Sequence, residues 1–228
     1  MPRDVGVVVV AAGKGSRFGG DMPKQYLDLG GSPVLLHAIR PFVSHPDVAA
    51  TVVVLPAEDS QSPPQWLAPL VSTTLRVVAG GATRRESVAA GMAALPEECA
   101  TVLVHDGARP FPSREVIDAT IAAARGGVGV IPAIPVSDTI KRADDFGLVL
   151  GTVPRAGLWR AQTPQGFPRA LLQRAHSIPD AVDQPATDDA MLVELAGGRV
   201  ELVPGSRRNI KITTAEDLAL AEWLLTRP

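Results

Sequence analysis

The sequence predicts an α/β fold with a mostly parallel sheet, and three observations support this class. Short apolar runs, beginning with VGVVVVAA at residues 5–12, alternate with amphipathic stretches, as in strands joined by helices. Serine or threonine residues stand at several helix starts, twice with a glutamate three positions later. The length of 228 residues suits one domain, because a single core grows to roughly 250 residues before a chain divides. We therefore expect residues 1–228 to form a single domain.

The expected strands are short runs of apolar, often β-branched residues bounded by turn-forming residues. The first, at residues 5–12, is apolar enough to be buried on both faces of a sheet. The others cover residues 50–56, 75–81, 101–110, 127–133 and 199–203, with a short strand near residue 210.

The expected helices begin at residues that can cap the free backbone N–H groups of a first turn. They start at Ser32–Pro33 (ending near Val43), at the capping box Thr83/Glu86, at Ser113, near residue 168 (ending near 177), at Thr187 (ending at Ala196), and at the capping box Thr213/Glu216 of the C-terminal helix.

A change of rhythm at residues 138–153 predicts a protruding β-hairpin. Two short β-like runs flank a polar turn at 143–147 with no helix between them, so the runs pair antiparallel. An isolated two-stranded hairpin is only marginally stable in water. We therefore expect this arm to pack on another surface, and a second copy of the chain is the natural partner.

Composition excludes several classes of protein. The formal net charge of −2 lacks the basic surplus of a nucleic-acid binder, so an anion site must be a local gathering of cations. No apolar run approaches the roughly 18 residues that span a bilayer, and the first residues do not form a signal peptide. Cys99 is the single cysteine, which favours a reducing compartment. We expect a cytoplasmic protein that binds neither nucleic acid nor a membrane.

A glycine-rich loop with three cations follows the first strand. Lys14, Arg17 and Lys24 are spread through it, and the backbone N–H groups of such a loop can face an anion. The spacing fails the P-loop pattern, since Gly15 follows Lys14, and the dinucleotide fingerprint, since Phe18 replaces its third glycine. A plain strand–helix turn with surface cations is the alternative. The spread of the cations favours several phosphates, as nucleotidyl transfer requires.

The segment AAGKGSRFGGDMPKQYL resembles the signature loop of 2-C-methyl-D-erythritol 4-phosphate cytidylyltransferases, which join CTP to methylerythritol phosphate in non-mevalonate isoprenoid synthesis. Other stretches similar to this family follow in order: GGATRRESV at 80–88, VHDGARPF at 104–111, PVSDTIKR at 135–142, RAGLWRAQTPQGF at 155–167, TDDA at 187–190 and NIKITTAEDLALAE at 209–222. The resemblance implies a Rossmann-like nucleotide-binding α/β domain whose hairpin arm builds a homodimer.

The resemblance also implies how CTP is bound. Backbone groups of Ala11, Ala12 and Gly13 would line its phosphates and ribose. Gly81 and Ser87 would contact cytosine and ribose. Arg17 and Lys24 would hold the triphosphate and stabilise the transition state at the α-phosphorus, and Asp106 would lie beside Mg²⁺ or another divalent cation and the substrate hydroxyls.

For the polyol phosphate, the resemblance implies a second set of residues. Arg109 and Thr139 would shape the methylerythritol pocket, while Arg155, Thr163 and Lys211 would bind and aim its phosphate. Since the arm is exchanged in this family, Thr139 and Arg155 could serve the site of the partner subunit. The catalytic cations implied are thus Arg17, Lys24, Arg155 and Lys211.

Ala82 departs from the family, which often has aspartate at this position. The departure bears on how strictly cytosine is selected. The chemistry itself needs no general base, because a phosphate monoester with a second pKa of about 6 is mostly dianionic at neutral pH. It needs cations that bring one anion against another.

Two other functions stay open at this point. One is a cytidylyltransferase for another polyol phosphate, such as ribitol 5-phosphate, whose family shares the loop and the C-terminal stretch. The other is a non-catalytic nucleotide-binding regulator, although a pure binder has no need to neutralise both attacker and leaving group. An NAD-dependent enzyme is disfavoured by the failed dinucleotide fingerprint.

Overall fold

The computed structural model describes residues 3–13, 23–179 and 186–227, and these residues form an α/β fold around an eight-stranded sheet. The strands lie in the order β10 (Trp159–Ala161), β7 (Gly129–Pro135), β11 (Gln165–Pro168), β6 (Thr101–Asp106), β1 (Val5–Val10), β4 (Val48–Leu55) and β5 (Leu75–Ala79), and β12 (Val200–Pro204) also pairs with β7. The predicted mostly parallel sheet is confirmed, because β1 pairs in parallel with β4 and β6, β4 with β5, and β7 with β12.

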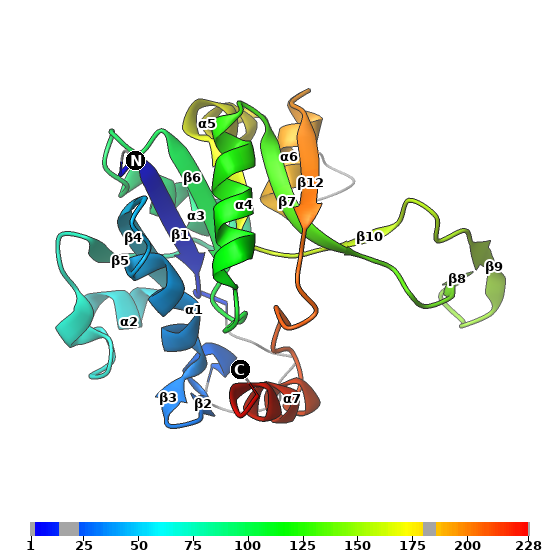
Figure 1. The fold of residues 1–228 in the computed structure, drawn as a ribbon, viewed down its shortest axis with the longest axis horizontal. Coiled ribbons are helices and arrows are strands. Elements are labelled where there is room, and N and C mark those ends of the chain that lie inside the picture. The colour runs from blue at the N-terminus through cyan, green and yellow to red at the C-terminus, as the bar shows by residue number, and fades with distance from the viewer. Residues whose placement is uncertain (1–2, 14–22, 180–185, 228) are drawn as a thin grey trace.

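Helices cover both faces of the sheet (Figure 1). One face packs against α3 (Arg84–Ala93), α5 (Arg169–Ser177) and α6 (Asp189–Leu195), and the other against α1 (Val34–Val43) and α4 (Arg114–Arg125). Strand β1 shows why both are needed, since Val8 faces the first core and Val7 and Val9 face the second, all fully buried. This is the double burial expected of a parallel strand. A short helix, α2 (Ala57–Gln61), follows β4.

The chain order creates a natural ligand position. From β1 the chain moves to β4 and β5 on one side, whereas β6 lies on the other side of β1. In doubly wound sheets, ligands bind outside the carboxyl ends of strands where the order reverses in this way. The residues after β1 and at the end of β6 meet at that point.

The C-terminal helix α7 (Ala215–Leu225) lies apart from the main sheet, beside the small hairpin β2 (Asp28–Leu29) and β3 (Ser32–Pro33) (Figure 1). A separate buried cluster that includes Leu29, Val34, Ile212 and Ala221 holds it there. None of the described helices is both long and apolar enough to cross a bilayer.

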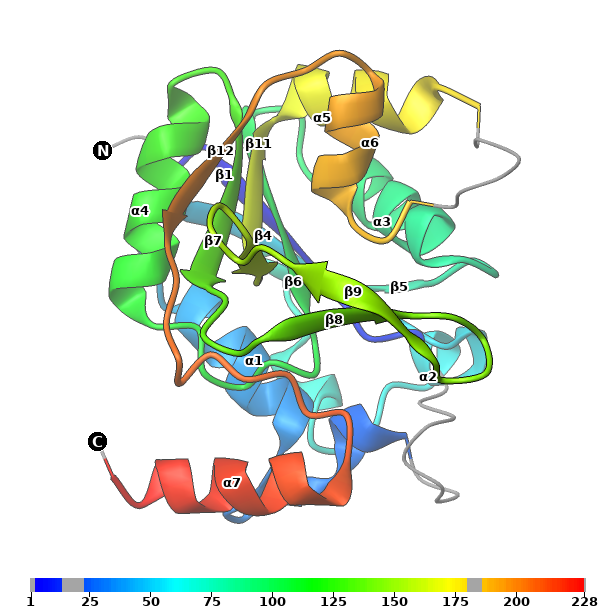
Figure 2. The same ribbon diagram turned by 90° about the vertical axis from the view of Figure 1, so that its right-hand side faces the viewer.

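The predicted hairpin is confirmed as β8 (Ile140–Ala143) paired antiparallel with β9 (Val149–Val153), and it projects away from the sheet (Figures 1 and 2). Its side chains face solvent in this single chain: Phe146 is 96% exposed, Leu148 67% and Leu150 61%.

Several sequence-based boundaries are wrong by a residue or more. Pro33, not Ser32, precedes α1, and both residues pair with β2 in the β2–β3 hairpin. Asp188, not Thr187, caps α6, since its carboxylate accepts from the backbone N–H of Met191. The last capping box is formed one residue later than expected, by Thr214 and Asp217.

The segment near residue 210 is not a strand in the structure, and four of the described strands were not predicted: the hairpin strands β2 and β3 and the sheet strands β10 and β11. Strands β10 and β11 are short, and β11 inserts antiparallel between β6 and β7. The glycine and proline of β11, Gly166 and Pro168, are typical of a loop at the level of sequence.

Candidate active site

A cavity of about 240 Å³ opens at the carboxyl ends of β1 and β6, where the chain order predicts a ligand. Five separate segments of the chain contribute to it: the end of β1, the short helix η1 (Lys24–Tyr26), the loop into α3, the end of β6 and the segment before α7. The expected site residues in its lining are Ala11, Ala12, Gly13, Lys24, Gly81, Ser87, Asp106 and Lys211.

The end of β1 is held open by a buried glutamine. Gln25 is 3% exposed, and its side-chain amide donates to the carbonyl oxygens of Ala11 at 2.7 Å and Gly13 at 3.2 Å. These two bonds occupy carbonyl groups that a regular helix or strand would otherwise pair. Lys24 immediately precedes Gln25, so these two hydrogen bonds also fix the backbone position of Lys24.

The loop between β5 and α3 lies against the end of β1. A Cβ atom on Gly80 would come within 2.4 Å of Ala12 Cβ, so only glycine permits this close approach. Ser87 is 2% exposed, and its hydroxyl accepts from the N–H of Gly81 and donates to the carbonyl of Thr83. Its hydroxyl is therefore already used to shape the loop, which leaves Gly81 and the neighbouring Ala82 at the cavity wall.

Lys211 reaches the cavity because the segment before α7 is tied to the sheet by polar contacts. The Asn209 amide donates to the carbonyl of Thr163 at 2.8 Å, and the N–H of Ile212 donates to the carbonyl of Ala108 at 2.8 Å. Gln162 adds a bond to the carbonyl of Ser206 at 2.8 Å. These contacts take the place of the short strand predicted from the sequence.

Asp106 is the carboxylate at the centre of a ring of cations. Its oxygens lie 2.8 Å from Lys211 Nζ, 3.6 Å from Arg109 Nε and 3.8 Å from an Arg84 nitrogen. Burial by itself raises the pKa of Asp106, but Lys211, Arg84 and Arg109 together lower this pKa well below its usual range. The group is thus ionised at any physiological pH.

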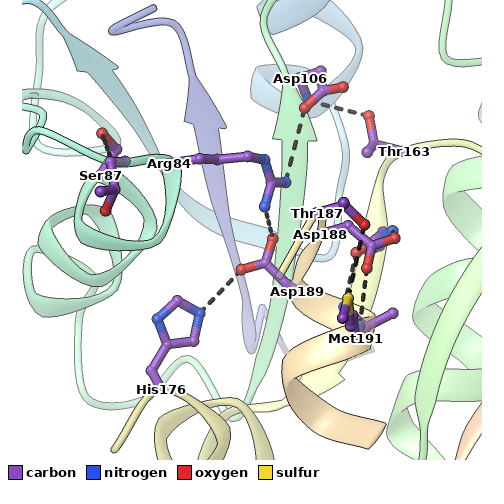
Figure 3. A network of polar contacts seen from close by, with 12 residues as sticks. Arg84, Ser87, Asp106, Thr163, His176, Thr187, Asp188, Asp189 and Met191 are labelled. Atoms are coloured by element: carbon purple, nitrogen blue, oxygen red, sulfur yellow. Dashed lines mark hydrogen bonds and ion pairs between the residues drawn. The ribbon is translucent and has the colours of Figure 1, made fainter. Parts of the chain in front are cut away.

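Arg84, the first residue of α3, connects Asp106 to a buried carboxylate on α6 (Figure 3). Its other terminal nitrogen lies 2.6 Å from Oδ2 of Asp189, which is fully buried, and His176 Nε2 lies 3.0 Å from the second oxygen of Asp189. Such a bridge fixes a guanidinium group more firmly than contacts with solvent do. Arg84 therefore links the start of α3, near Gly81, to the start of α6, near Asp188.

A smaller cavity of about 200 Å³ continues past Asp106 and shares Arg84, Asp106 and Lys211 with the first. Arg109 and Thr163 are in its lining. The Thr163 hydroxyl accepts from the N–H of Asp106 at 3.0 Å and lies 3.0 Å from Nδ1 of the buried His105. Thr163 thus fixes the backbone that presents the Asp106 carboxylate.

The structure does not bring every expected residue to these cavities. Arg17 lies outside the described residues. Thr139 and Arg155 are exposed at the base of the arm and are absent from the lining of both cavities, and Arg155 donates instead to the carbonyl of Ser137. Within one chain, therefore, the arm contributes no residue to the site among those described.

Sequence reasoning missed Gln25, Arg84 and Asp189. Gln25 and Arg84 stand inside stretches that were matched to a known family, but nothing in their local pattern indicates the long-range contacts that they make. Asp188 and Asp189 both follow Thr187 at the predicted helix start, where either acid could complement the helix dipole. The structure separates them, since Asp188 caps α6 and Asp189 is a buried partner of Arg84.

Asp106 could bind a divalent cation only if substrate phosphates supplied further ligands. Among the described residues, no group of three or more histidine, cysteine or acidic side chains is arranged to hold a metal ion. Mg²⁺ commonly binds through one or two carboxylates together with substrate phosphates and water. One ionised carboxylate beside a cation-lined cavity matches that pattern.

A doubly wound sheet with a cation-lined cavity at its switch point defines a nucleotide-binding protein of the α/β class. The family model for 2-C-methyl-D-erythritol 4-phosphate cytidylyltransferase matches residues 5–227. The chain belongs to this family of nucleotidyltransferases.

Similar proteins agree with this assignment. The chain is 45% identical over 233 residues to 2-C-methyl-D-erythritol 4-phosphate cytidylyltransferase of Stenotrophomonas maltophilia (strain R551-3), covering all of this chain and 99% of that protein. It is 47% identical to the bifunctional enzyme IspD/IspF of Rhodospirillum rubrum, of which it spans 56% of the length. A crystal structure of 4-diphosphocytidyl-2C-methyl-D-erythritol synthase from Anaerococcus prevotii superposes with a TM-score of 0.84 at 32% identity, covering 98% of this chain and 96% of that one.

Proposed function

We propose that the chain, as one nucleotidyltransferase domain, joins CTP and 2-C-methyl-D-erythritol 4-phosphate to give 4-diphosphocytidyl-2-C-methyl-D-erythritol and pyrophosphate. The observation that carries the proposal is that Lys24 and Lys211, from opposite ends of the sequence, line one cavity together with Asp106. Family membership names the reaction, and this gathering of opposite charges supplies the chemistry that it needs.

In the proposed reaction, an oxygen of the polyol phosphate attacks the α-phosphorus of CTP, and the bond from that phosphorus to the departing pyrophosphate breaks. Lys24 neutralises the triphosphate, and Lys211 neutralises the attacking phosphate. Lysine suits these roles because a compact ammonium on a flexible stem can follow an oxygen as it moves. A divalent cation held by Asp106 and the phosphates would stabilise the charge that develops at phosphorus.

His105 is not a general base in this proposal. Its Nε2 faces the carbonyl of Arg109 at 3.0 Å and its Nδ1 faces the Thr163 hydroxyl, so both ring nitrogens are used inside the protein. Because the attacking phosphate is already a dianion at neutral pH, no proton has to be removed. The reaction thus depends on the placement of charge rather than on proton transfer.

The proposal includes a homodimer formed through the arm. Phe146, Leu148 and Leu150 are largely exposed on a two-stranded hairpin, and such a hairpin needs a packing partner for stability. In a dimer, Thr139 and Arg155 would reach the site of the other subunit. We expect sedimentation velocity to show a dimer that Leu148→Glu shifts toward monomer with loss of activity; a monomeric but fully active wild-type protein would contradict this part.

We also propose a cytoplasmic location, since Cys99 is a buried free thiol. Fractionation of cells that express the chain tests this point, and the proposal fails if the protein is found outside the cytoplasmic fraction.

The test of the reaction is incubation with CTP, Mg²⁺ and methylerythritol phosphate, followed by mass analysis and pyrophosphate detection. A parallel arm replaces the acceptor with ribitol 5-phosphate, and another adds EDTA. We expect the cytidine diphosphate adduct only with methylerythritol phosphate and only without EDTA. Adduct formation with ribitol phosphate instead would assign the chain to another acceptor, and CTP binding without pyrophosphate release would make it a regulator.

A further inference from the structure

A third hollow shares Lys211 with the first cavity and gathers four cations. It has a volume of about 440 Å³, and its lining includes Arg109, Arg160, Arg207 and Lys211. Asp217 is the acidic residue in this lining, and its carboxylate is occupied by Thr213 and the backbone of Thr214. The hollow therefore carries a surplus of positive charge in a chain whose formal net charge is −2.

Arg160 and Arg207 have no structural task among the described residues. Both are exposed, and neither forms a side-chain hydrogen bond or ion pair with any of those residues. Other arginines of the chain do have such tasks: Arg84 binds Asp189, Arg125 binds Asp47, and Arg109 donates to the carbonyl of Asn209. The two unused guanidinium groups come from β10 and from the segment before α7, and they converge on one hollow.

The cations of this hollow repel one another. Burial lowers the pKa of Arg109, the ion pair with Asp106 opposes this, and the like charge of Arg160 lowers the pKa further. An anion that enters the hollow relieves this repulsion, and paired arginines suit the bidentate binding of phosphate oxygens. The hollow therefore favours a phosphate group as its occupant.

Lys211 lines both the hollow and the first cavity. This shared residue indicates which of the two substrates lies in each. Lys24 lines only the first of these two, so the triphosphate lies on its side. An anion in the hollow then lies beside Lys211 and away from Lys24, which suits the attacking phosphate rather than the triphosphate.

We propose that Arg160 and Arg207 are substrate-binding residues that capture the phosphate monoester of the polyol phosphate and pass it to Lys211. This inference rests on the proposed function and adds two residues that no step of it uses. The charges of these two arginines attract and hold the polyol phosphate before it reacts. They therefore lower the KM for the polyol phosphate and leave kcat at saturating substrate unchanged.

The test is the double variant Arg160→Gln/Arg207→Gln, compared with the control Arg40→Gln/Arg174→Gln. The control residues are exposed on α1 and α5 and outside the cavities described, and the net charge changes equally. We expect the KM for methylerythritol phosphate to rise about tenfold in the first variant, from two exposed charge-assisted contacts of about 0.7 kcal/mol each. The KM for CTP and kcat should stay within about twofold.

Two further readouts separate the possible failures. Raising salt should reduce kcat/KM for the polyol phosphate less steeply in the test variant than in the control, since fewer charges steer the substrate. Calorimetric titration with methylerythritol phosphate should show the same tenfold weakening without turnover. Unchanged KM and binding in an active enzyme, or an equal rise in KM for CTP, overturns the inference alone. A wild-type protein that neither binds nor converts the polyol phosphate overturns both this inference and the proposed function.

Discussion

Lys211 Nζ lies 2.8 Å from Asp106 Oδ2, although the two residues come from opposite halves of the sequence. The pair exists because the segment before α7 is bound along the ends of β6 and β11 by Asn209, Gln162 and Ile212. Asp106 thus balances part of the charge that Lys211 brings. A substrate anion can take the place of Asp106 beside Lys211, because Asp106 still has Arg84 and Arg109 as partners. No buried charge is then left unpaired, which would be costly.

The adjacent acids Asp188 and Asp189 should respond very differently to the same change. Asp189→Asn removes the charge of a fully buried partner of Arg84 and His176, and we expect the free energy of unfolding to fall by about 3 kcal/mol. Asp188→Asn retains a capping oxygen for α6 and should cost about 1 kcal/mol. Urea denaturation measures both values. Equal losses would show that the two acids share the role of helix-end charges.

Ala82 offers a test of base selection. It is exposed at the wall of the first cavity beside Gly81. We expect cytosine beside Gly81, where an aspartate at position 82 would accept a hydrogen bond from the cytosine amino group and would repel the corresponding oxygen of uracil. We expect Ala82→Asp to raise the ratio of kcat/KM for CTP over UTP about tenfold, the value of one charge-assisted hydrogen bond of about 1.4 kcal/mol. Ala82→Ser is the control, and an unchanged ratio in the aspartate variant would place cytosine elsewhere.

His105 should make the fold sensitive to acid. Burial lowers the pKa of His105 to about 4, although its hydrogen bond to the Arg109 carbonyl and the charge of Asp106 oppose this. Since the unfolded chain takes up this proton near pH 6.5, stability is full above that pH and is lost as the pH falls toward 4. The difference from an ordinary pKa of 6.5 corresponds to about 3 kcal/mol.

The measurement is the free energy of unfolding at pH 7 and pH 4 for wild type and for His105→Gln. Other titrating groups act in both proteins, so the difference between the two pH dependences isolates His105. We expect the variant to lose about 3 kcal/mol less than wild type on acidification. Parallel curves would mean that the pKa of His105 is the same in the folded and unfolded protein.

The layered fold could be predicted because its cause is local. Strands such as β1, buried on both faces, need long apolar runs, and α3 and α4 begin at the expected caps Thr83 and Ser113. The β10 and β11 strands could not be predicted, since three or four residues pair only because β6 and β7 are already in place. The shift of the last capping box has a similar origin: Asp217 binds Thr213 as well as Thr214, and periodicity does not distinguish these two registers.

The candidate site divides in the same way. Asp106 is predictable because it ends a buried strand at the switch point. The role of Arg84 is not, because it depends on Asp189, more than 100 positions away, and on His176 behind it. Thr139 and Arg155 remain predictions that concern a second subunit, and Arg17 lies outside the described residues.

The central claim is that Lys24 and Lys211 neutralise two different anions in one reaction. Turnover at saturating CTP, Mg²⁺ and methylerythritol phosphate, measured for Lys24→Ala and Lys211→Ala, tests it most directly. The control is Arg40→Ala, whose side chain is exposed on α1 and outside the cavities described. We expect each of the first two variants, with unfolding curves like that of wild type, to lose at least about 10²-fold in kcat, and the control to lose less than about twofold. Near-normal turnover in both correctly folded variants would contradict the account.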